Sequence, residues 1–195
     1  KKWSFYIGTP LKSSPAIKKD IIYITSQSGY IYAIDRGKLN WKLNTESITS
    51  PCISEEGIIY SISRKGDLIA IDSSKGERLW SYILKDKTQN NPSFDEYSKS
   101  VYTACNNGIL YALKSKGQLK WTFKADSAIK TSPLLDNKGN IYFSSIEGKI
   151  YALNSYGIKK WVLDIKSPVT SSLNLSPEGI LYITSKAGFL YASGE

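Results

Sequence analysis

The chain has 195 residues, of which 41% are hydrophobic and 12% aromatic, and its 26 basic and 17 acidic side chains give a formal net charge of +9. It contains no histidine, which excludes Ser-His-Asp and Cys-His nucleophile systems and histidine ligation of zinc. No apolar run reaches the length of about 18 residues that a membrane-spanning helix needs, so we expect no membrane insertion.

One sequence unit recurs along the whole chain at intervals of about 40 residues. Each unit has a polar residue followed in most cases by Pro, an apolar run with Tyr, a Gly turn, an apolar run ending in Ala, a second Gly turn and Trp. The marker residues are Trp3, Trp41, Trp80, Trp121 and Trp161, and Ala33, Ala70, Ala112, Ala152 and Ala192. A self-similar period of this length indicates an array of one supersecondary unit.

The units predict short strands rather than helices. Each offers four apolar segments of about five residues that are rich in Ile, Tyr and Val and separated by turn residues. Segments such as residues 21–24 and 30–34 are nearly continuous apolar runs, which is typical of strands whose sheet is buried on both faces. We therefore expect a single domain, 1–195, of four-stranded antiparallel sheets. Its parts are an outer strand 1–7 and blade repeats of approximately 8–45, 46–85, 86–125, 126–165 and 166–195.

Residues 33–41 (Ala-Ile-Asp-Arg-Gly-Lys-Leu-Asn-Trp) and 70–80 (Ala-Ile-Asp-Ser-Ser-Lys-Gly-Glu-Arg-Leu-Trp) carry a resemblance to a known family. They resemble the repeat of pyrroloquinoline-quinone (PQQ) dehydrogenases and their non-enzymatic β-propeller relatives. The third and fourth units differ slightly, with Lys114 and Asn154 in place of Asp. The resemblance implies a β-propeller in which each Trp docks between neighbouring blades, against the small Ala and the Gly turn.

The two ends of the chain predict how the ring closes. The last unit stops after a third strand, and the chain begins with a fourth. Joined, Gly194-Glu195-Lys1-Lys2-Trp3 matches residues 157–161 at four of five positions. We therefore expect an all-β, five-bladed propeller in which Lys1–Ile7 closes the last blade as its outer strand (3+1 closure). The alternative is a slice of a longer array of seven or eight blades.

The residues predict neither a metal site nor a cofactor. The quinone dehydrogenases use an adjacent cysteine pair and a catalytic carboxylate with calcium, whereas this chain has only Cys52 and Cys105, far apart. We interpret both as buried free thiols. The acidic doublets Glu55-Glu56 and Asp95-Glu96 lie in predicted turns, where neighbouring side chains point different ways. Solvated turns are therefore favoured over a carboxylate pair of the kind that hydrolyses glycosides, and we expect no catalytic residue.

The positive charge comes from Lys, with only three Arg. Lys is common on exposed edge strands, whereas nucleic-acid readers gather Arg and aromatic residues on one face. We expect no specific nucleic-acid binding, and a monomer.

Candidate ligand-binding residues lie at two kinds of position. The first is the polar residue before each inner strand, which would line the mouth of the central channel. The second is the variable turn between the second and third strands. The candidates are Ser14, Ser50, Asn91, Ser132 and Ser172 at the first, and Gln27, Arg64, Lys65, Asn106, Asn107 and Glu147 at the second. Hydrogen bonding to local backbone is the alternative role for the first group.

Two functions remain open. The favoured one is a non-catalytic scaffold that presents its rim or channel mouth to a protein or peptide partner, as repeat arrays often do. The alternative is a carbohydrate-binding module or a hydrolase that acts at the channel mouth. The resemblance also implies an extracytoplasmic location (periplasmic, cell-surface or secreted), because relatives of this kind are mostly bacterial envelope or secreted proteins.

Overall fold

The computed structural model describes residues 2–169 and 171–194. All regular structure in these residues is β, in five antiparallel sheets that we call blades. None of the described segments forms a helix of the length and apolarity needed to cross a bilayer. The strands are β1 Ala16–Lys18, β2 Ile21–Thr25, β3 Tyr30–Asp35 and β4 Lys38–Asn44 in the first blade; β5 Cys52–Ile53, β6 Ile58–Ile62, β7 Asp67–Asp72 and β8 Glu77–Ile83 in the second; β9 Ser93–Asp95, β10 Ser100–Ala104, β11 Ile109–Lys114 and β12 Leu119–Lys124 in the third; β13 Leu134–Leu135, β14 Ile141–Ser144, β15 Lys149–Leu153 and β16 Lys159–Asp164 in the fourth; and β17 Asn174–Leu175, β18 Leu181–Thr184 and β19 Leu190–Ser193 in the fifth.

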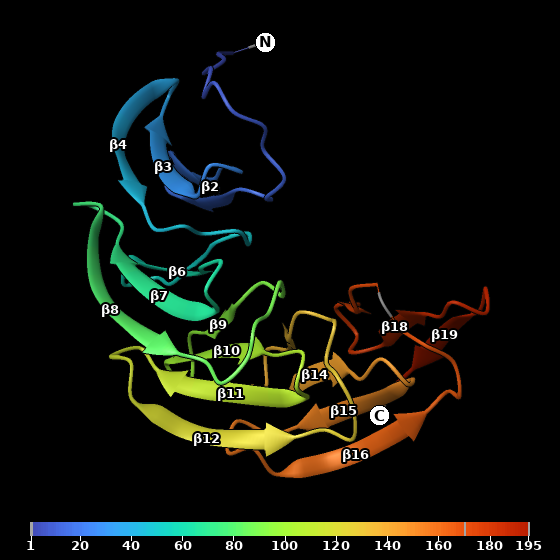
Figure 1. Cartoon of the computed structure of the whole chain (residues 1–195). Coiled ribbons are helices and arrows are strands. Elements are labelled where there is room, and N and C mark those ends of the chain that lie inside the picture. Colours follow the sequence, from blue (N-terminus) through green and yellow to red (C-terminus); the bar gives the residue numbers. More distant parts are fainter. Residues whose placement is uncertain (1, 170, 195) are drawn as a thin grey trace.

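The blades follow one another along an arc (Figure 1). The first blade, drawn in blue, and the last blade, drawn in red, lie at its two ends. Within each blade the strands pair in chain order, as hairpin-connected strands of a propeller blade do. A hydrophobic cluster fills each of the four interfaces between consecutive blades. The core is therefore divided among the interfaces, as it is in other repeat arrays.

The apolar run 30–34 is confirmed as a strand covered on both faces, with residues 31–34 buried, whereas in the run 21–24 only Tyr23 is buried. In β7 the four central residues are all buried, with Leu68 and Ile69 facing opposite sides of the sheet. Ile69 belongs to the cluster shared with the first blade, and Leu68 to the cluster shared with the third. A strand between two neighbours has no solvent-facing side, so alternation of polar and apolar residues disappears.

The outer-strand Trp of each of the first three blades contacts the next blade. Trp41, from β4, lies on the turn between β7 and β8 of the next blade, and its Nε1 donates a hydrogen bond to the carbonyl of Ser73 at 2.9 Å. Gly76 in that turn has φ +69°, and a Cβ there would come within 2.5 Å of the Trp41 ring. Glycine therefore supplies both the backbone conformation and the space. Trp80 on Gly117 and Trp121 on Gly157 repeat the contact, which confirms the docking that the family resemblance implied.

The repeated Ala makes room for an aromatic pair within each of the first four blades. Ala33 pairs with Tyr23 on one side and with Trp41 on the other. Because the Ala side chain is small, the two rings meet across it, with their centroids 6.0 Å apart. A register shift directly after Ala33 forms a bulge in the pairing of β3 with β4. Bulges of this kind bend a strand and re-aim its side chains, and here the bulge adjoins the position from which Trp41 reaches the next blade.

The expected closure by the N-terminal strand is not found in this structure. Residues 2–7 form no strand, and the last blade has three strands, so β19 has no outer neighbour among the described residues. Trp3 lies instead on Gly37 of the first blade. The reason is geometric: successive blades turn too gradually to bring the last one round to the first (Figure 1). The all-β architecture of four-stranded antiparallel blades is confirmed, but a closed five-bladed ring is not.

Candidate functional site

The polar residues before the inner strands form hydrogen bonds from blade to blade. The backbone N–H of Ser14 donates to Ser50 Oγ at 2.8 Å, that of Ser50 to Asn91 Oδ1 at 2.9 Å, and that of Asn91 to Ser132 Oγ at 2.8 Å. We call these four residues the inner ladder. Three of the candidate side-chain oxygens, those of Ser50, Asn91 and Ser132, thus accept bonds from the preceding blade, in place of the local backbone bonds weighed from the sequence. Ser172 is exposed in the last blade.

The variable turns between second and third strands lie together on one edge of the arc. In a four-stranded antiparallel blade these turns are on one edge, and the turns between third and fourth strands are on the opposite edge. Arg64 donates through Nη2 to the carbonyl of Gln27 in the first blade. Lys65 Nζ lies 3.6 Å from Glu46 Oε2, and both side chains are mostly exposed. We call this edge, with Gln27, Arg64, Lys65, Asn106, Asn107 and Glu147, the variable-turn face.

The remaining members of this face differ in how much they are engaged. Asn106 Oδ1 accepts a hydrogen bond from Lys130 Nζ at 2.8 Å, and Asn107 Oδ1 accepts one from the backbone N–H of Ile109 at 3.1 Å. Glu147 is exposed. A polar cavity of ≈ 230 Å³ lies beside Lys65 and Glu46 and is also lined by Ser63 and Arg78. The face therefore offers exposed charge next to a small hollow, where the inner ladder offers satisfied hydrogen bonds.

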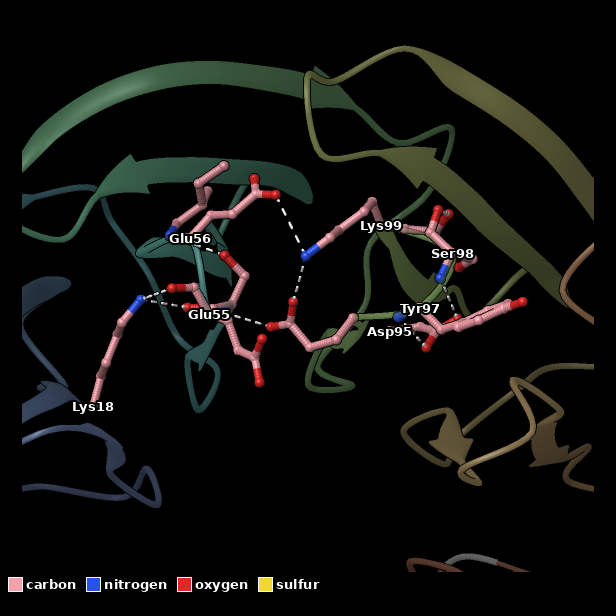
Figure 2. A network of polar contacts seen from close by, with 11 residues as sticks. Lys18, Glu55, Glu56, Asp95, Tyr97, Ser98 and Lys99 are labelled. Carbon is pink, nitrogen blue, oxygen red and sulfur yellow. Dashed lines mark hydrogen bonds and ion pairs between the residues drawn. The ribbon is translucent and has the colours of Figure 1, made fainter.

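The acidic doublets of the second and third blades meet across their interface (Figure 2). Lys99 Nζ lies 3.0 Å from Glu96 and 3.4 Å from Glu56, and the Glu96 carboxylate also accepts from the backbone N–H of Glu55. Lys18, from the first blade, donates to the backbone carbonyls of Ser54 and Glu55. The hydrogen bond with Glu96, and after it the one with Glu56, raises the pKa of Lys99.

This network joins three blades, and the carboxylates of Glu56 and Glu96 share one cation, Lys99. Hydrolysis of a glycoside needs two carboxyl groups that face each other across an open gap, and Lys99 occupies the space between Glu56 and Glu96. The sequence analysis interpreted the doublets as separate solvated turns and did not predict this contact between Glu56, Lys99 and Glu96. The signal was available, because Glu55 and Glu96 occupy equivalent positions one repeat apart.

A second charged contact joins the third and fourth blades. The carboxylate of Asp126, just after β12, accepts from Lys149 Nζ at 2.7 Å and from the Tyr151 hydroxyl at 2.7 Å, both on β15. Partial burial would raise the pKa of Asp126, but the hydrogen bonds, led by that from Lys149, outweigh it and lower the pKa to about 2. Asp126 is therefore ionised at neutral pH, so it cannot act as a general acid there, and its ion pair with Lys149 links the third and fourth blades.

Both cysteines are free and lie among apolar side chains at the interface of the second and third blades, where Cys105 is buried as expected and Cys52 is half-buried. Burial raises the pKa of the Cys52 thiol and of the Cys105 thiol to about 12. The backbone N–H of Cys105 bonds the carbonyl of Ile109, as Ser63 does with Asp67 one repeat earlier. Cys105 therefore takes a position that Ser occupies in the preceding repeat. Neither thiol is ionised at neutral pH, which argues against a nucleophile.

A larger cavity of ≈ 660 Å³ lies between the fourth and last blades, and no sequence-predicted site residue lines it. Two carboxylate residues, Asp136 and Glu178, line it, and Asp136 is engaged in its own turn. It accepts from Asn140 Nδ2 at 2.7 Å and from the Tyr142 hydroxyl at 3.0 Å. Within residues 2–169 and 171–194, no group of three or more Asp, Glu or Cys side chains is placed to hold a metal ion.

Comparison with known proteins gives the same architecture. The chain is 26% identical over 130 residues to the outer membrane protein assembly factor BamB of Moranella endobia, an alignment that covers 65% of this chain and 33% of that protein. The chain therefore spans about a third of the length of this curated relative.

Solved structures agree on the fold. BamB from Moraxella catarrhalis superposes with a TM-score of 0.76 at 19% identity, over 98% of this chain and 64% of that one. A quinohemoprotein alcohol dehydrogenase from Pseudomonas putida superposes with a TM-score of 0.81 at 17% identity, over 98% of this chain and 41% of that one. Since both a non-dehydrogenase and a dehydrogenase share these blades, the superpositions establish the fold and not the chemistry.

The family model described as outer membrane protein assembly factor BamB (PQQ_2) matches residues 84–193, more than half of the chain. The chain therefore belongs to this family of PQQ-like repeat propellers, which confirms the resemblance carried by its Ala-Ile-Asp…Trp repeats.

Proposed function

We propose that this chain is a non-catalytic, extracytoplasmic scaffold that binds a protein or peptide partner on its variable-turn face. The relatives that carry the family's name are assembly factors for outer membrane proteins, which supports both a protein partner and a location in the envelope. The carrying observation is the contrast between two sets of polar residues. The inner ladder uses its hydrogen bonds on neighbouring blades, whereas Arg64 and Lys65 are exposed at the surface, where they contact the Gln27 carbonyl and Glu46, and Lys65 lines a polar hollow.

The quinone cofactor of the related dehydrogenases does not fit the residues of this chain. Cys52 lies on β5 and Cys105 follows β10, so they form no adjacent pair, and burial keeps both thiols protonated. Glu56 and Glu96 share Lys99, and Asp126 holds Lys149. Each of these carboxylates thus already contacts a lysine, although Glu56 and Glu96 share a single one, and a lysine between the two carboxylates disfavours a bound divalent ion there. This donor set supports a scaffold rather than a cofactor-dependent oxidase.

The test compares two charge-matched double variants. Arg64→Ser with Lys65→Ser removes two cations from the variable-turn face. Lys75→Ser with Lys116→Ser removes two exposed cations from turns between third and fourth strands, on the opposite edge. Each variant and the parent are immobilised and exposed to a bacterial envelope fraction, and bound proteins are quantified by mass spectrometry. The main bound protein is then purified and its Kd is measured against all three.

We expect the Arg64/Lys65 variant to weaken binding at least tenfold and the Lys75/Lys116 variant to change it less than twofold. Equal losses in both variants would show that only net charge matters and would contradict the site. A glycan array run in parallel addresses the carbohydrate alternative, since selective binding to one sugar class by the parent would overturn the scaffold.

A further inference from the structure

The polar hollow between the first and second blades lies where the second blade departs from the repeat. At one position of the third strand the other units carry Tyr32, Tyr111, Tyr151 and Tyr191, and the second unit carries Ile69. Ile69 is 1% exposed and lines the hollow of ≈ 230 Å³. A smaller side chain therefore stands beside this hollow in the place of a repeated Tyr.

At the next two interfaces the Tyr is present and bonds the segment that follows the outer strand of the preceding blade. The Tyr151 hydroxyl donates to Asp126 Oδ1 at 2.7 Å and accepts from the backbone N–H of Asp126 at 3.2 Å. The Tyr111 hydroxyl accepts from the backbone N–H of Lys85 at 3.3 Å. The Tyr151 ring also packs edge-on against Phe123 of the preceding blade, with the centroids 5.6 Å apart. A ring with one polar end thus joins two blades at this place.

The first interface has the same surroundings without the ring. Glu46 occupies the position of Asp126 in the repeat, and its backbone N–H donates to Asn44 Oδ1 at 3.2 Å. Leu43 occupies the position of Phe123 and packs in the cluster between the first two blades. Replacement of large side chains by smaller ones in a packed interface leaves a cavity. Two aliphatic residues in place of two aromatic ones account for the hollow.

The charges around the hollow favour a neutral polar occupant over an ion. Two carboxylates, Glu46 and Asp67, and two cations, Lys65 and Arg78, line it, so the four formal charges cancel. Lys65 contacts Glu46. The side chains of Asp67 and Arg78 form no ion pair or hydrogen bond with any residue in the described part of the chain. A guanidinium without a carboxylate partner is free to lie on the face of an aromatic ring.

The size of the hollow also limits its occupant. Its volume of ≈ 230 Å³ is below the range of about 300–1,000 Å³ that holds drug-sized ligands, so it suits one side chain rather than an oligosaccharide. Ile69 gives it an apolar wall, and Glu46 and Asp67 give it hydrogen-bond acceptors. A tyrosine side chain has an apolar ring and a hydroxyl that needs a partner when buried, which matches both features.

We propose that this hollow takes a tyrosine side chain of the protein partner, whose ring replaces the Tyr that the second blade lacks. The hydroxyl lies at Glu46, as that of Tyr151 lies at Asp126, and the ring lies between Ile69 and Arg78. This inference rests on the proposed function, because it names the group that the partner presents to the variable-turn face. Tyr is among the residues that most often anchor protein interfaces in pockets.

The first experiment lets the chain fill the hollow itself. Ile69→Tyr restores the residue of the repeat, and we expect it to weaken the binding of the purified envelope partner about tenfold or more, as loss of an anchoring side chain does. Its melting temperature should equal or exceed that of the parent. The matched control, Ile69→Val, keeps the hollow open and should change the Kd by about twofold or less. If Arg64→Ser with Lys65→Ser loses the partner and Ile69→Tyr does not, the inference fails and the proposed function stands.

A second variant tests the other wall of the hollow without touching the core. Arg78 is exposed, and Leu39 and Leu119 pair with the third strand at its position in the first and third blades. Arg78→Leu is therefore compatible with the fold. We expect it to weaken the binding of the partner about threefold or more, because the cation over the ring is lost. Unchanged binding would contradict the place of the ring between Ile69 and Arg78.

A small probe tests the hollow without the partner. Saturation-transfer NMR compares N-acetyl-L-tyrosinamide with N-acetyl-L-phenylalaninamide on the full chain. We expect the tyrosine probe to bind the parent about threefold or more tightly than the phenylalanine probe, because its hydroxyl adds a hydrogen bond, and to lose this binding in Ile69→Tyr. Absent binding of the tyrosine probe to the parent would overturn the inference, and so would equal binding to the parent and to Ile69→Tyr.

Discussion

The second and last blades have the same sequence pattern and different surroundings. In the second blade, β6 (Ile-Ile-Tyr-Ser-Ile) and β7 (Asp-Leu-Ile-Ala-Ile-Asp) are buried on both faces. In the last blade, β18 (Leu-Tyr-Ile-Thr) alternates between buried and exposed residues, and β19 (Leu-Tyr-Ala-Ser) has none that is buried. The strand sequences do not cause this difference. Burial in the array depends on whether a blade has a neighbour on each face, because stability in repeat folds comes largely from nearest-neighbour interfaces.

The sharpest way to test the comparison is to truncate the same aromatic residue in both blades. Tyr60 is fully buried and stacks on Phe94 with a centroid separation of 5.1 Å. We expect Tyr60→Ala to lower the free energy of unfolding by about 3–5 kcal/mol, as removal of buried aromatic side chains does. Tyr182→Ala should cost about 1 kcal/mol or less, since that ring is already partly in water. Urea titration followed by Trp fluorescence gives both values. Equal losses of stability would contradict the partial exposure of Tyr182 in the last blade.

Glycine substitutions probe the same difference at the turns. Gly117 has φ +87° and a Cβ there would lie 2.8 Å from the Trp80 ring, whereas Gly188 has φ +84° and nothing within 4 Å. The left-handed conformation costs an Ala about 1 kcal/mol at either position. The Trp80 clash should add about 1–3 kcal/mol at Gly117 alone. Melting temperatures of Gly117→Ala and Gly188→Ala measure this difference. An equal or larger loss for Gly188→Ala would contradict the close contact of Trp80 with Gly117.

The ion pair of Asp126 with Lys149 makes the stability of the interface between the third and fourth blades depend on pH. The pKa of Asp126 is lowered to about 2, so its contribution to stability is fully present above its ordinary pKa of 3.8 and is lost as the pH falls from there towards 2. The last blade has Phe189 where the fourth has Lys149, so it lacks this pair. We expect Asp126→Asn to cost about 1 kcal/mol at pH 7, since water screens a partly exposed pair, and to flatten the acid limb of the stability curve. An unchanged acid limb in thermal melts between pH 2 and pH 5 would rule out this role.

The smallest effect expected has the opposite sign. The Tyr60 hydroxyl is buried without a hydrogen-bond partner, while the Tyr102 hydroxyl is 3.2 Å from Ser98 Oγ. Removing an unpaired buried polar group relieves its desolvation penalty, and removing a paired one loses the bond. Tyr60→Phe should therefore be neutral or stabilise the chain by up to about 1 kcal/mol, and Tyr102→Phe should destabilise it by a similar amount. Paired urea titrations at one pH would reveal a reversed order, which would contradict this account of the two hydroxyls.

The sequence predicted those features that depend on residues within one repeat. The Trp-on-Gly contact and the small Ala between two rings follow from spacing that recurs in every unit, and both are present. Ring closure was not predictable in this way. The match of Lys1-Lys2-Trp3 to residues 159–161 predicted an outer strand, but residues 2–7 form no strand in the structure. Whether this segment could reach β19 depends on the angle between successive blades. That angle arises from packing across interfaces rather than from any one strand.

The candidate site shows the same limit: residue types within one repeat could be read from the sequence, whereas contacts between repeats could not. Residue type at the inner strands indicated polar groups, yet only the structure shows that Ser50 and Asn91 accept hydrogen bonds from the preceding blade. The bridge of Lys99 between Glu56 and Glu96 also crosses an interface. A contact between two repeats is hidden from a pattern that describes one repeat at a time, and it becomes visible when equivalent positions are compared about 40 residues apart.

Native-state hydrogen exchange tests the dependence of burial on neighbours most directly. The amides of β6 and β7, covered on both faces, should exchange only through global unfolding. Those of β18 and β19 should exchange through local opening at a much lower free energy. At dilute concentration we expect protection to fall from the second blade to the last, with β19 exchanging fastest among the third strands. Equal protection of β7 and β19 in the dilute parent would contradict the account, because it would mean that the last blade is covered within a single copy.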